Sequence, residues 1–270
     1  MLQTNTWIYL TVQKTGSTFL SKKLIEVYGQ AAFSKDRKHG IQKKSTSKSK
    51  IITIRDPFDY YFSLWSYGLD GKGGFSNKLR ISNPSLAEKI YGDKTKSCFS
   101  HFLDLALSFP GRNSQSEVSW RPRSTDLYTA RILTMLVPQD KIERFSSELD
   151  CDFSGKSIAK SLNELLPEVI IRTEYLNYDF HYLASAGELD FMELPTNWSQ
   201  IFVKDAARLN SYSSHEVDGK KLKQHELLSE YHKNLIELKC TTAKYLIQTA
   251  NERIKAVSYT HLRAHETHND

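Results

Sequence analysis

The chain has few cysteines and no long apolar run. Its 270 residues include three cysteines, Cys98, Cys151 and Cys240, which are odd in number and form no closely spaced pair. That pattern argues against a disulfide framework and against a cysteine zinc site, and it favours buried thiols. Because no apolar stretch approaches the roughly 20 residues that a membrane-spanning helix needs, we expect no integral membrane segment.

Little sequence precedes the first expected strand. The apolar run 7–12 begins within a few residues of Met1, which leaves no room for a signal peptide if Met1 is the true start. We therefore expect a cytoplasmic protein, unless the chain is a truncated lumenal domain. With 39% hydrophobic residues, a chain of 270 residues can bury one sizeable core. A single domain is expected over residues 1–256.

Glycine does not occur before position 16, and this absence decides between two kinds of phosphate loop. The apolar run 7–12 predicts a strand and the apolar spacing of residues 19–27 predicts a helix. Residues 14–18, Lys-Thr-Gly-Ser-Thr, form the short loop between them, where the first amides of the helix point outward and favour an anion. A nucleotide triphosphatase loop needs a Gly upstream and then the order Gly-Lys-Ser/Thr. This loop has neither feature and is therefore of another kind.

A second short strand, residues 51–54, ends in an arginine and leads into a helix. Pro57 suits the first turn of that helix because its missing N–H is not needed there. Apolar side chains share one face of the expected helix, which leaves Ser63 on another part of its surface. Arg55 at the strand end and Ser63 on the second turn are therefore predicted to converge on one anion.

These two segments together resemble the cofactor-binding motifs of sulfotransferases that use 3′-phosphoadenosine 5′-phosphosulfate (PAPS). The family has such a Lys-containing loop after its first strand, and an Arg-Asn/Asp-Pro sequence with a Ser eight residues after the Arg. Residues 168–176, which contain Arg-x-Glu-x-Leu, and residues 209–211, Leu-Asn-Ser, fit the family more loosely. The resemblance covers residues 6–250. It implies an α/β fold of three layers, a central parallel sheet flanked by helices, of the sulfotransferase-type, P-loop-like kind.

The resemblance also implies roles for the matched residues, with no metal required. Lys14 is the implied catalytic residue, stabilising charge on the bridging oxygen as the sulfuryl group leaves in line. The residues implied to bind PAPS or its product, 3′-phosphoadenosine 5′-phosphate (PAP), are Lys14, Thr15, Gly16, Ser17, Thr18, Phe19, Arg55, Ser63, Asn210 and Ser211. Two positions depart from the family: Gln13 replaces the usual Pro before the Lys, and Tyr60 stands where many relatives have Arg.

Sulfuryl transfer to a hydroxyl also needs a base that accepts the proton of the acceptor. His39 is the sole His between Lys14 and Arg55, and an imidazole with a pKa near neutrality suits that task. Several sulfotransferases place a His or a Glu in this region, so we expect His39 to be catalytic. Glu174 is the alternative base. The expected acceptor is a hydroxyl-bearing small molecule or a glycan, and the sequence does not indicate an oligomeric state.

Acidic residues are scarce between positions 35 and 50, where seven Lys and Arg residues accompany a lone Asp36. This run carries much of the formal net charge of +6. One interpretation is a solvated loop between strands. The other is a collar that attracts an anionic cofactor or an acidic acceptor. Nucleic acid is not an expected partner, because the run lacks the interleaved aromatic residues of a stacking surface.

Three further segments have expected structures but no assigned chemistry. The glycine-rich residues 69–84 predict a long mobile loop, which would be able to cover the site. Residues 223–251 predict one long closing helix. Residues 257–270 lack an apolar period and resemble translated adapter sequence, so we expect a non-native or disordered tail.

Two alternatives to a sulfotransferase remain open at this point. One is a nucleotide-dependent phosphotransferase, against which the Lys-before-Gly order of residues 14–16 argues. The other is a non-catalytic protein of the same fold that binds PAP or a polyanion through its basic residues.

Overall fold

The computed structural model describes residues 1–34, 46–108, 126–141, 162–203, 216–217, 220–221 and 227–266. These residues form an α/β structure around a four-stranded sheet with the order β1-β2-β3-β4. The strands are β1 (Leu2–Gln3), β2 (Trp7–Leu10), β3 (Ser49–Ile54) and β4 (Val169–Arg172). A separate antiparallel pair comprises β5 (Glu216–Val217) and β6 (Lys220–Lys221).

The expected sheet was a central parallel one; the observed sheet is mixed, with three parallel strands and one antiparallel edge strand. Strands β2, β3 and β4 are parallel, with Tyr9 opposite Ile51 and Ile51 opposite Val169. Strand β1 runs antiparallel to β2, because the tight turn between them reverses the chain. In that turn the Thr4 hydroxyl accepts a hydrogen bond from the Trp7 amide at 3.2 Å. A two-residue edge strand of this kind gives no apolar period that a sequence pattern would reveal.

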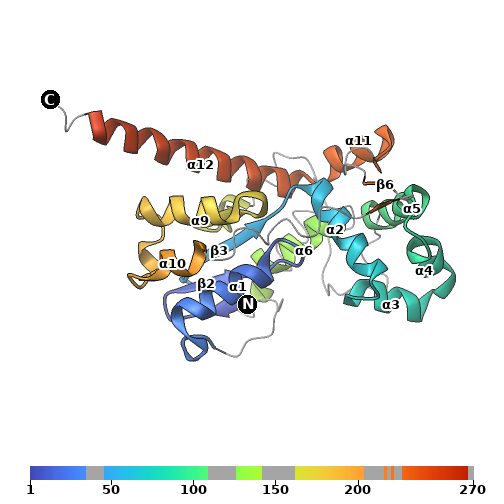
Figure 1. The fold of residues 1–270 in the computed structure, drawn as a ribbon, viewed down its shortest axis with the longest axis horizontal. Helices are drawn as coiled ribbons and strands as arrows, with labels where there is room; N and C mark the ends of the chain where they lie inside the picture. The colour runs from blue at the N-terminus through green and yellow to red at the C-terminus, as the bar shows by residue number, and fades with distance from the viewer. Residues whose placement is uncertain are drawn as a thin grey trace.

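Helices make up most of the remaining described structure, and Figure 1 shows how they are arranged around the sheet. The N-terminal half contains α1 (Ser17–Tyr28), α2 (Pro57–Leu69), α3 (Gly74–Ser82), α4 (Pro84–Tyr91), α5 (Lys96–Leu107) and α6 (Leu127–Leu136). The C-terminal half contains α9 (Leu176–Ser185), α10 (Trp198–Val203), α11 (Glu230–Lys239) and α12 (Thr241–Glu266). Short 3-10 turns are η1 (Gln30–Ala32), η2 (Gln139–Lys141), η3 (Thr173–Tyr175) and η4 (Asp190–Met192).

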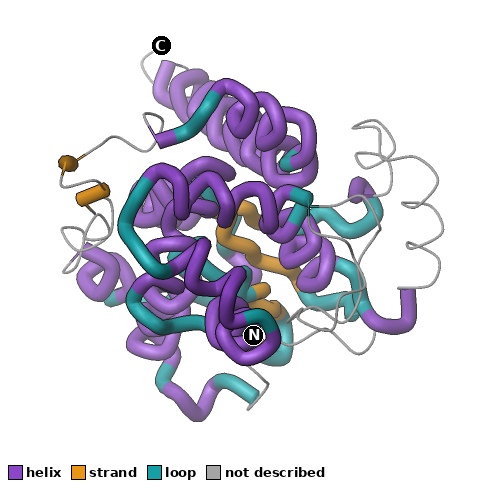
Figure 2. The backbone as a smooth tube through the Cα atoms, turned by 90° about the vertical axis from the view of Figure 1, so that its right-hand side faces the viewer, coloured by secondary structure: helices purple, strands orange, loops and turns teal. Residues whose placement is uncertain are grey.

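The two faces of the sheet contact two different apolar clusters, because successive strand residues point to opposite faces. Ile52 and Ile170 belong to the larger cluster, which also contains residues of α2, α5, α6, α11 and α12. Ile51 and Val169 belong to the smaller one, together with residues of α1, α9 and α10. Figure 2 shows the sheet at the centre of the molecule with helices around it. Burial on both faces explains why the fully buried parts of the parallel strands, residues 7–10, 51–54 and 169–171, are apolar except at Thr53.

The expectation of a loop over residues 69–84 is wrong, since most of these residues are helical. Helices α3 and α4 occupy residues 74–82 and 84–91, and the Asn83 side chain caps α4 by accepting from the Leu86 amide at 3.1 Å. Pro84 stands in the first turn of α4, where its missing N–H is harmless. The glycines mark a tight turn between α2 and α3, in which Gly71 and Gly73 have positive φ values of 69° and 94°.

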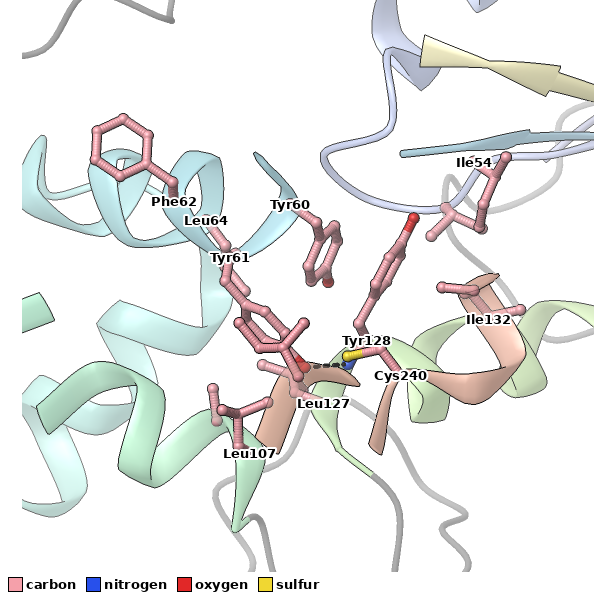
Figure 3. Close-up of a cluster of buried hydrophobic side chains, with 14 of the residues drawn as sticks. Ile54, Tyr60, Tyr61, Phe62, Leu64, Leu107, Leu127, Tyr128, Ile132 and Cys240 are labelled. Atoms are coloured by element: carbon pink, nitrogen blue, oxygen red, sulfur yellow. Dashed lines mark hydrogen bonds between the residues drawn. The ribbon is translucent and has the colours of Figure 1, made fainter. Parts of the chain in front are cut away.

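The single closing helix expected over residues 223–251 is two helices, α11 and α12, which meet at Cys240. Cys240 ends α11 with a ψ of 36°, and its thiol is fully buried among the residues drawn in Figure 3. Burial raises the pKa of this thiol well above its ordinary value. The expectation of buried thiols is therefore confirmed for Cys240, whereas Cys98 is half-buried and Cys151 lies outside the described residues.

Helix α12 continues to Glu266 and thus into the segment expected to be a tail. The expectation that residues 257–270 are a non-native or disordered tail stays a prediction. Among the residues that the structure describes, no helix combines the length and apolar character needed to cross a bilayer.

Candidate functional site

The loop between β2 and α1 has an unusual backbone at two positions. Gly16 has a φ of 73° and Lys14 a φ of 64°; besides Lys14, Glu193 is the one other described non-glycine residue with positive φ. A left-handed conformation costs a residue with a Cβ about 1–2 kcal/mol, and such strain is concentrated at functional sites in proteins. A Cβ on Gly16 would lie 2.9 Å from Leu176 Cδ1, so glycine is required there for space as well as for φ.

The Thr15 side chain fastens this loop to the sheet. Its hydroxyl donates to the Val12 carbonyl at 2.9 Å and shares a hydrogen bond of 2.8 Å with the Thr53 hydroxyl of β3. Thr53 in turn bonds the Tyr9 hydroxyl of β2 at 2.9 Å, and burial raises the pKa of Tyr9. All three side chains are fully buried. The Thr15 hydroxyl is therefore directed into the protein, and Thr15 can offer a ligand only its backbone amide.

Helix α1 begins directly after Gly16 and has no side-chain cap. Its N-cap residue is a glycine and its first turn contains no acidic residue, whereas Asp56 caps α2 and Asp126 caps α6. The positive end of the α1 dipole is thus not offset by a carboxylate of its own first turn. Of the residues expected to bind the cofactor here, Ser17 is buried, Thr18 is exposed and Phe19 is half-buried.

Arg55 lies against the same loop, at the end of β3. Its guanidinium Nη1 donates to the Lys14 carbonyl at 3.4 Å, and its Nε lies 3.9 Å from Glu174 Oε1. The Tyr128 hydroxyl fixes the Arg55 backbone, accepting from its amide at 2.8 Å and donating to its carbonyl at 3.0 Å. The two predicted strand ends therefore lie side by side. Ser63 is 7% exposed on α2, and its contact with the same anion stays a prediction.

Glu174 lies next to Arg55 and also binds the start of α2. Its Oε1 accepts the Asp56 amide at 3.0 Å, while Thr173 of the same turn donates its hydroxyl to the Ile54 carbonyl at 2.9 Å. Burial raises the pKa of Glu174, an effect that the Asp56 amide and Arg55 partly oppose. These contacts indicate that Glu174 positions Arg55. Its role as the alternative base stays a prediction.

The ammonium group of Lys14 lies over the Tyr67 ring of α2, 4.1 Å from the ring centroid. Burial, the largest cause, acts together with the charges of Arg55, Arg131 and Lys72 to lower the Lys14 pKa to about 8, while Asp70 opposes them. Burial and neighbouring cations both disfavour a charged amine. An anion bound next to Lys14 would therefore offset these effects and stabilise its charged form.

Arg131 is a buried charged residue that the sequence pattern did not single out. It is 5% exposed in the middle of α6, and its Nη1 donates to the Tyr60 hydroxyl at 2.7 Å. Tyr60 stacks on Tyr128, with ring centroids 3.6 Å apart. Figure 3 shows the two rings facing each other. One signal in the sequence pointed to it: Arg131 is the single charged residue of the ten in α6. The apolar spacing around it indicates a core helix, and that pattern does not predict a charged residue in the helix.

Raising the pH should stabilise the protein through Lys14. The native pKa of about 8 is below the ordinary 10.5, so between these values the unfolded chain binds more protons and stability increases with pH. Urea unfolding of wild type and Lys14→Met at several pH values measures this effect. Their difference in unfolding free energy should shift in favour of wild type between about pH 8 and 10.5 and be level below pH 8. The exposed Lys22→Met variant is the control, and a constant difference for Lys14→Met would contradict the assignment.

Several expected site residues lie outside the described residues. They are His39, Asn210 and Ser211, together with residues 35–45 of the basic run. Their roles stay predictions. Within the part of the chain that is described, no group of three or more His, Cys, Asp or Glu side chains is arranged to hold a metal ion.

Comparisons with known proteins give no relative for this chain. No family model, curated protein or solved structure matches it.

Proposed function

We propose that the protein is a sulfotransferase, which moves a sulfuryl group from PAPS to a hydroxyl or amine of an acceptor such as a carbohydrate. The observation that carries this proposal is the meeting of Lys14 and Arg55 beside the uncapped start of α1. These groups lie at the carboxyl ends of parallel strands β2 and β3, where open α/β sheets bind ligands. Two cations, outward amides and a glycine turn form a suitable site for a nucleotide with phosphate groups at both ends.

In this proposal, different residues would bind the two phosphate-bearing ends of PAPS. The amides at the start of α1 and the Lys14 ammonium would hold the 5′-phosphosulfate, and Arg55 with Ser63 would hold the 3′-phosphate. Phe19 would stand against the adenine. Thr15 takes part through its backbone only, because its hydroxyl is bonded to Val12 and Thr53.

The proposed chemistry is an in-line displacement at sulfur. PAPS supplies the activated sulfuryl group; the acceptor oxygen forms the new S–O bond as the bond to the 5′-phosphate breaks, with PAP as the leaving group. Lys14 stabilises the negative charge that develops on the bridging oxygen. His39 or Glu174 takes the proton of the acceptor. Positioning and charge stabilisation provide most of the rate in the analogous transfer of phosphoryl groups, and the same is expected here.

The proposal includes the finer description of the fold. A sulfotransferase-type, P-loop-like domain has helices on both faces of a central sheet. The apolar clusters on the two faces of β2, β3 and β4 support that arrangement. So does the order of strand, Lys-containing loop and helix at residues 7–28.

Replacing Arg55 with Ala should weaken PAP binding about 10- to 100-fold, because hydrogen bonds to charged groups contribute about 1.5–3 kcal/mol. Calorimetry with PAP and with ATP on wild type and variant measures this loss. Arg80→Ala, which removes a guanidinium of α3 that bonds the Gly68 carbonyl, is the matched control. Equal affinity of wild type for ATP and PAP would favour the phosphotransferase. PAP binding without labelled sulfate transfer to any of a panel of hydroxyl acceptors would favour the non-catalytic binding protein.

A further inference from the structure

The guanidinium of Arg55 makes only long contacts with the described residues around it. Its Nη1 donates to the Lys14 carbonyl at 3.4 Å, and its Nε lies 3.9 Å from Glu174 Oε1, which is beyond hydrogen-bond length. That Nε is buried and has no hydrogen-bond partner in the described part of the chain. The direction of this side chain therefore depends on how firmly the Arg55 backbone is fixed.

The Arg55 backbone is fixed by a side chain of α6. The pairing of β3 with β4 ends at Ile54, one residue earlier. Arg55 instead donates its amide to the Tyr128 hydroxyl at 2.8 Å, and its carbonyl accepts from the same hydroxyl at 3.0 Å. Backbone groups left unpaired in the interior of a protein cost free energy. The Tyr128 hydroxyl thus takes the place of a partner strand for the last residue before α2.

Tyr128 is itself held on several sides. It is fully buried, and its ring stacks on that of Tyr60 in α2 at an interplanar angle of 10°. Its amide donates to Oδ1 of Asp126, the N-cap residue of α6, at 2.9 Å. Burial raises the pKa of Tyr128 well above its ordinary value, so the hydroxyl keeps its proton and can donate and accept at once. The end of β3 is therefore attached to a rigid point.

We propose that Tyr128 is a positioning residue of the donor site: its hydroxyl fixes the backbone from which the Arg55 guanidinium reaches the 3′-phosphate of PAPS. The inference rests on the proposed function and deepens it, because it assigns part of the donor affinity to a residue that acts through Arg55. A guanidinium binds a phosphate through two parallel N–H···O bonds, so its direction matters as much as its charge. A displacement of about 1 Å in a positioned group can cost about 100-fold.

The test is calorimetry with PAP on the full chain, comparing wild type with Tyr128→Phe, which keeps the ring and removes the hydroxyl. Tyr128→Phe should bind PAP about 10-fold more weakly, with an unchanged number of sites per chain. A hydroxyl that merely stabilised the fold would lower the number of binding-competent chains and leave their affinity at the wild-type value. Tyr28→Phe is the matched control, because its hydroxyl donates to the Met192 carbonyl at 2.7 Å from the end of α1 opposite the Lys14 loop. It should bind PAP like wild type.

A double-mutant cycle with Arg55→Ala shows whether Tyr128 acts through Arg55. Without the guanidinium, removal of the hydroxyl has no side chain to misdirect. Tyr128→Phe should therefore weaken PAP binding of the Arg55→Ala protein by less than about 2-fold. A loss of about 10-fold in both backgrounds would overturn the inference, because the hydroxyl would then act independently of Arg55.

The outcomes separate the inference from the proposed function. Wild-type PAP affinity in Tyr128→Phe would overturn the role of Tyr128 and leave the sulfotransferase proposal standing. Absence of PAP binding by wild type itself would overturn the proposed function, and the role of Tyr128 with it. If Tyr128→Phe does not fold, hydrogen exchange in wild type decides. The Arg55 amide should exchange as slowly as the buried amides of β3, and exchange at the rate of an unpaired loop amide would refute a fixed backbone at this position.

Discussion

Replacing Lys14 with Ala should lower the rate of sulfuryl transfer about 100- to 1,000-fold, the usual effect of removing one group that stabilises developing charge. Lys14 reaches the site from a left-handed backbone position next to the start of α1. Under the proposed function, its ammonium would lie where charge develops on the leaving oxygen. Labelled sulfate transfer under saturating PAPS and acceptor measures the change, and PAP affinity should fall much less than the rate.

The matched control for Lys14→Ala is Lys22→Ala. Lys22 belongs to α1, but its side chain is 72% exposed and pairs with Glu26 on the helix surface. Its loss should leave both rate and affinity at wild-type values. A wild-type transfer rate in Lys14→Ala would end the assignment of Lys14 as the catalytic residue.

Gly16→Ala should destabilise the protein by about 2–4 kcal/mol and abolish anion binding at the loop, because two costs act together. The added Cβ would be forced into a φ of 73°, and it would lie 2.9 Å from Leu176 Cδ1 and 3.4 Å from Thr173 Cγ2. To relieve that contact, the loop would have to move away from the turn at residues 173–175, which contains Glu174, and from the neighbouring Arg55. Urea unfolding measures the loss of stability, and calorimetry with PAP measures the loss of binding.

Gly71→Ala separates the two costs of the previous substitution. Gly71 has a similar φ of 69°, but nothing lies within 4 Å of the position of its added Cβ. This variant should therefore show the backbone cost alone, about 1–2 kcal/mol. If Gly16→Ala were no more destabilising than Gly71→Ala, the close packing of the loop against Leu176 would not constrain it.

The sequence was sufficient to predict the elements nearest the proposed site. Buried parallel strands have continuous apolar runs, so β2, β3 and β4 were recognisable from their composition. Helix α2 has local signals as well: Pro57 at its first position, directly after Asp56, whose side chain accepts from the Phe58 and Asp59 amides. These signals are local in the chain, which is why they could be read without a structure.

The missed features depend on contacts between distant residues. Arg131 and Tyr60 are 71 positions apart, and the packing of α6 against α2 brings them into hydrogen-bond contact. The glycines at positions 71 and 73 indicated a loop, but they form only the turn before α3, which a periodic pattern did not resolve. The break at Cys240 was hidden for a related reason, because apolar spacing continues through both α11 and α12 while the backbone does not.

The hydrogen-bonded hydroxyls of Tyr9, Thr53 and Thr15 have a consequence for ligand binding. They tie the Lys14 loop to two neighbouring strands before any ligand arrives, so the conformational entropy of the loop is lost when the protein folds. Binding then requires little further ordering of the backbone, and the loop acts as a rigid receptor. A phosphate or sulfate group would bind amides that are already oriented. Little of the interaction energy would then be lost to ordering the loop, and more of it would contribute to affinity and rate.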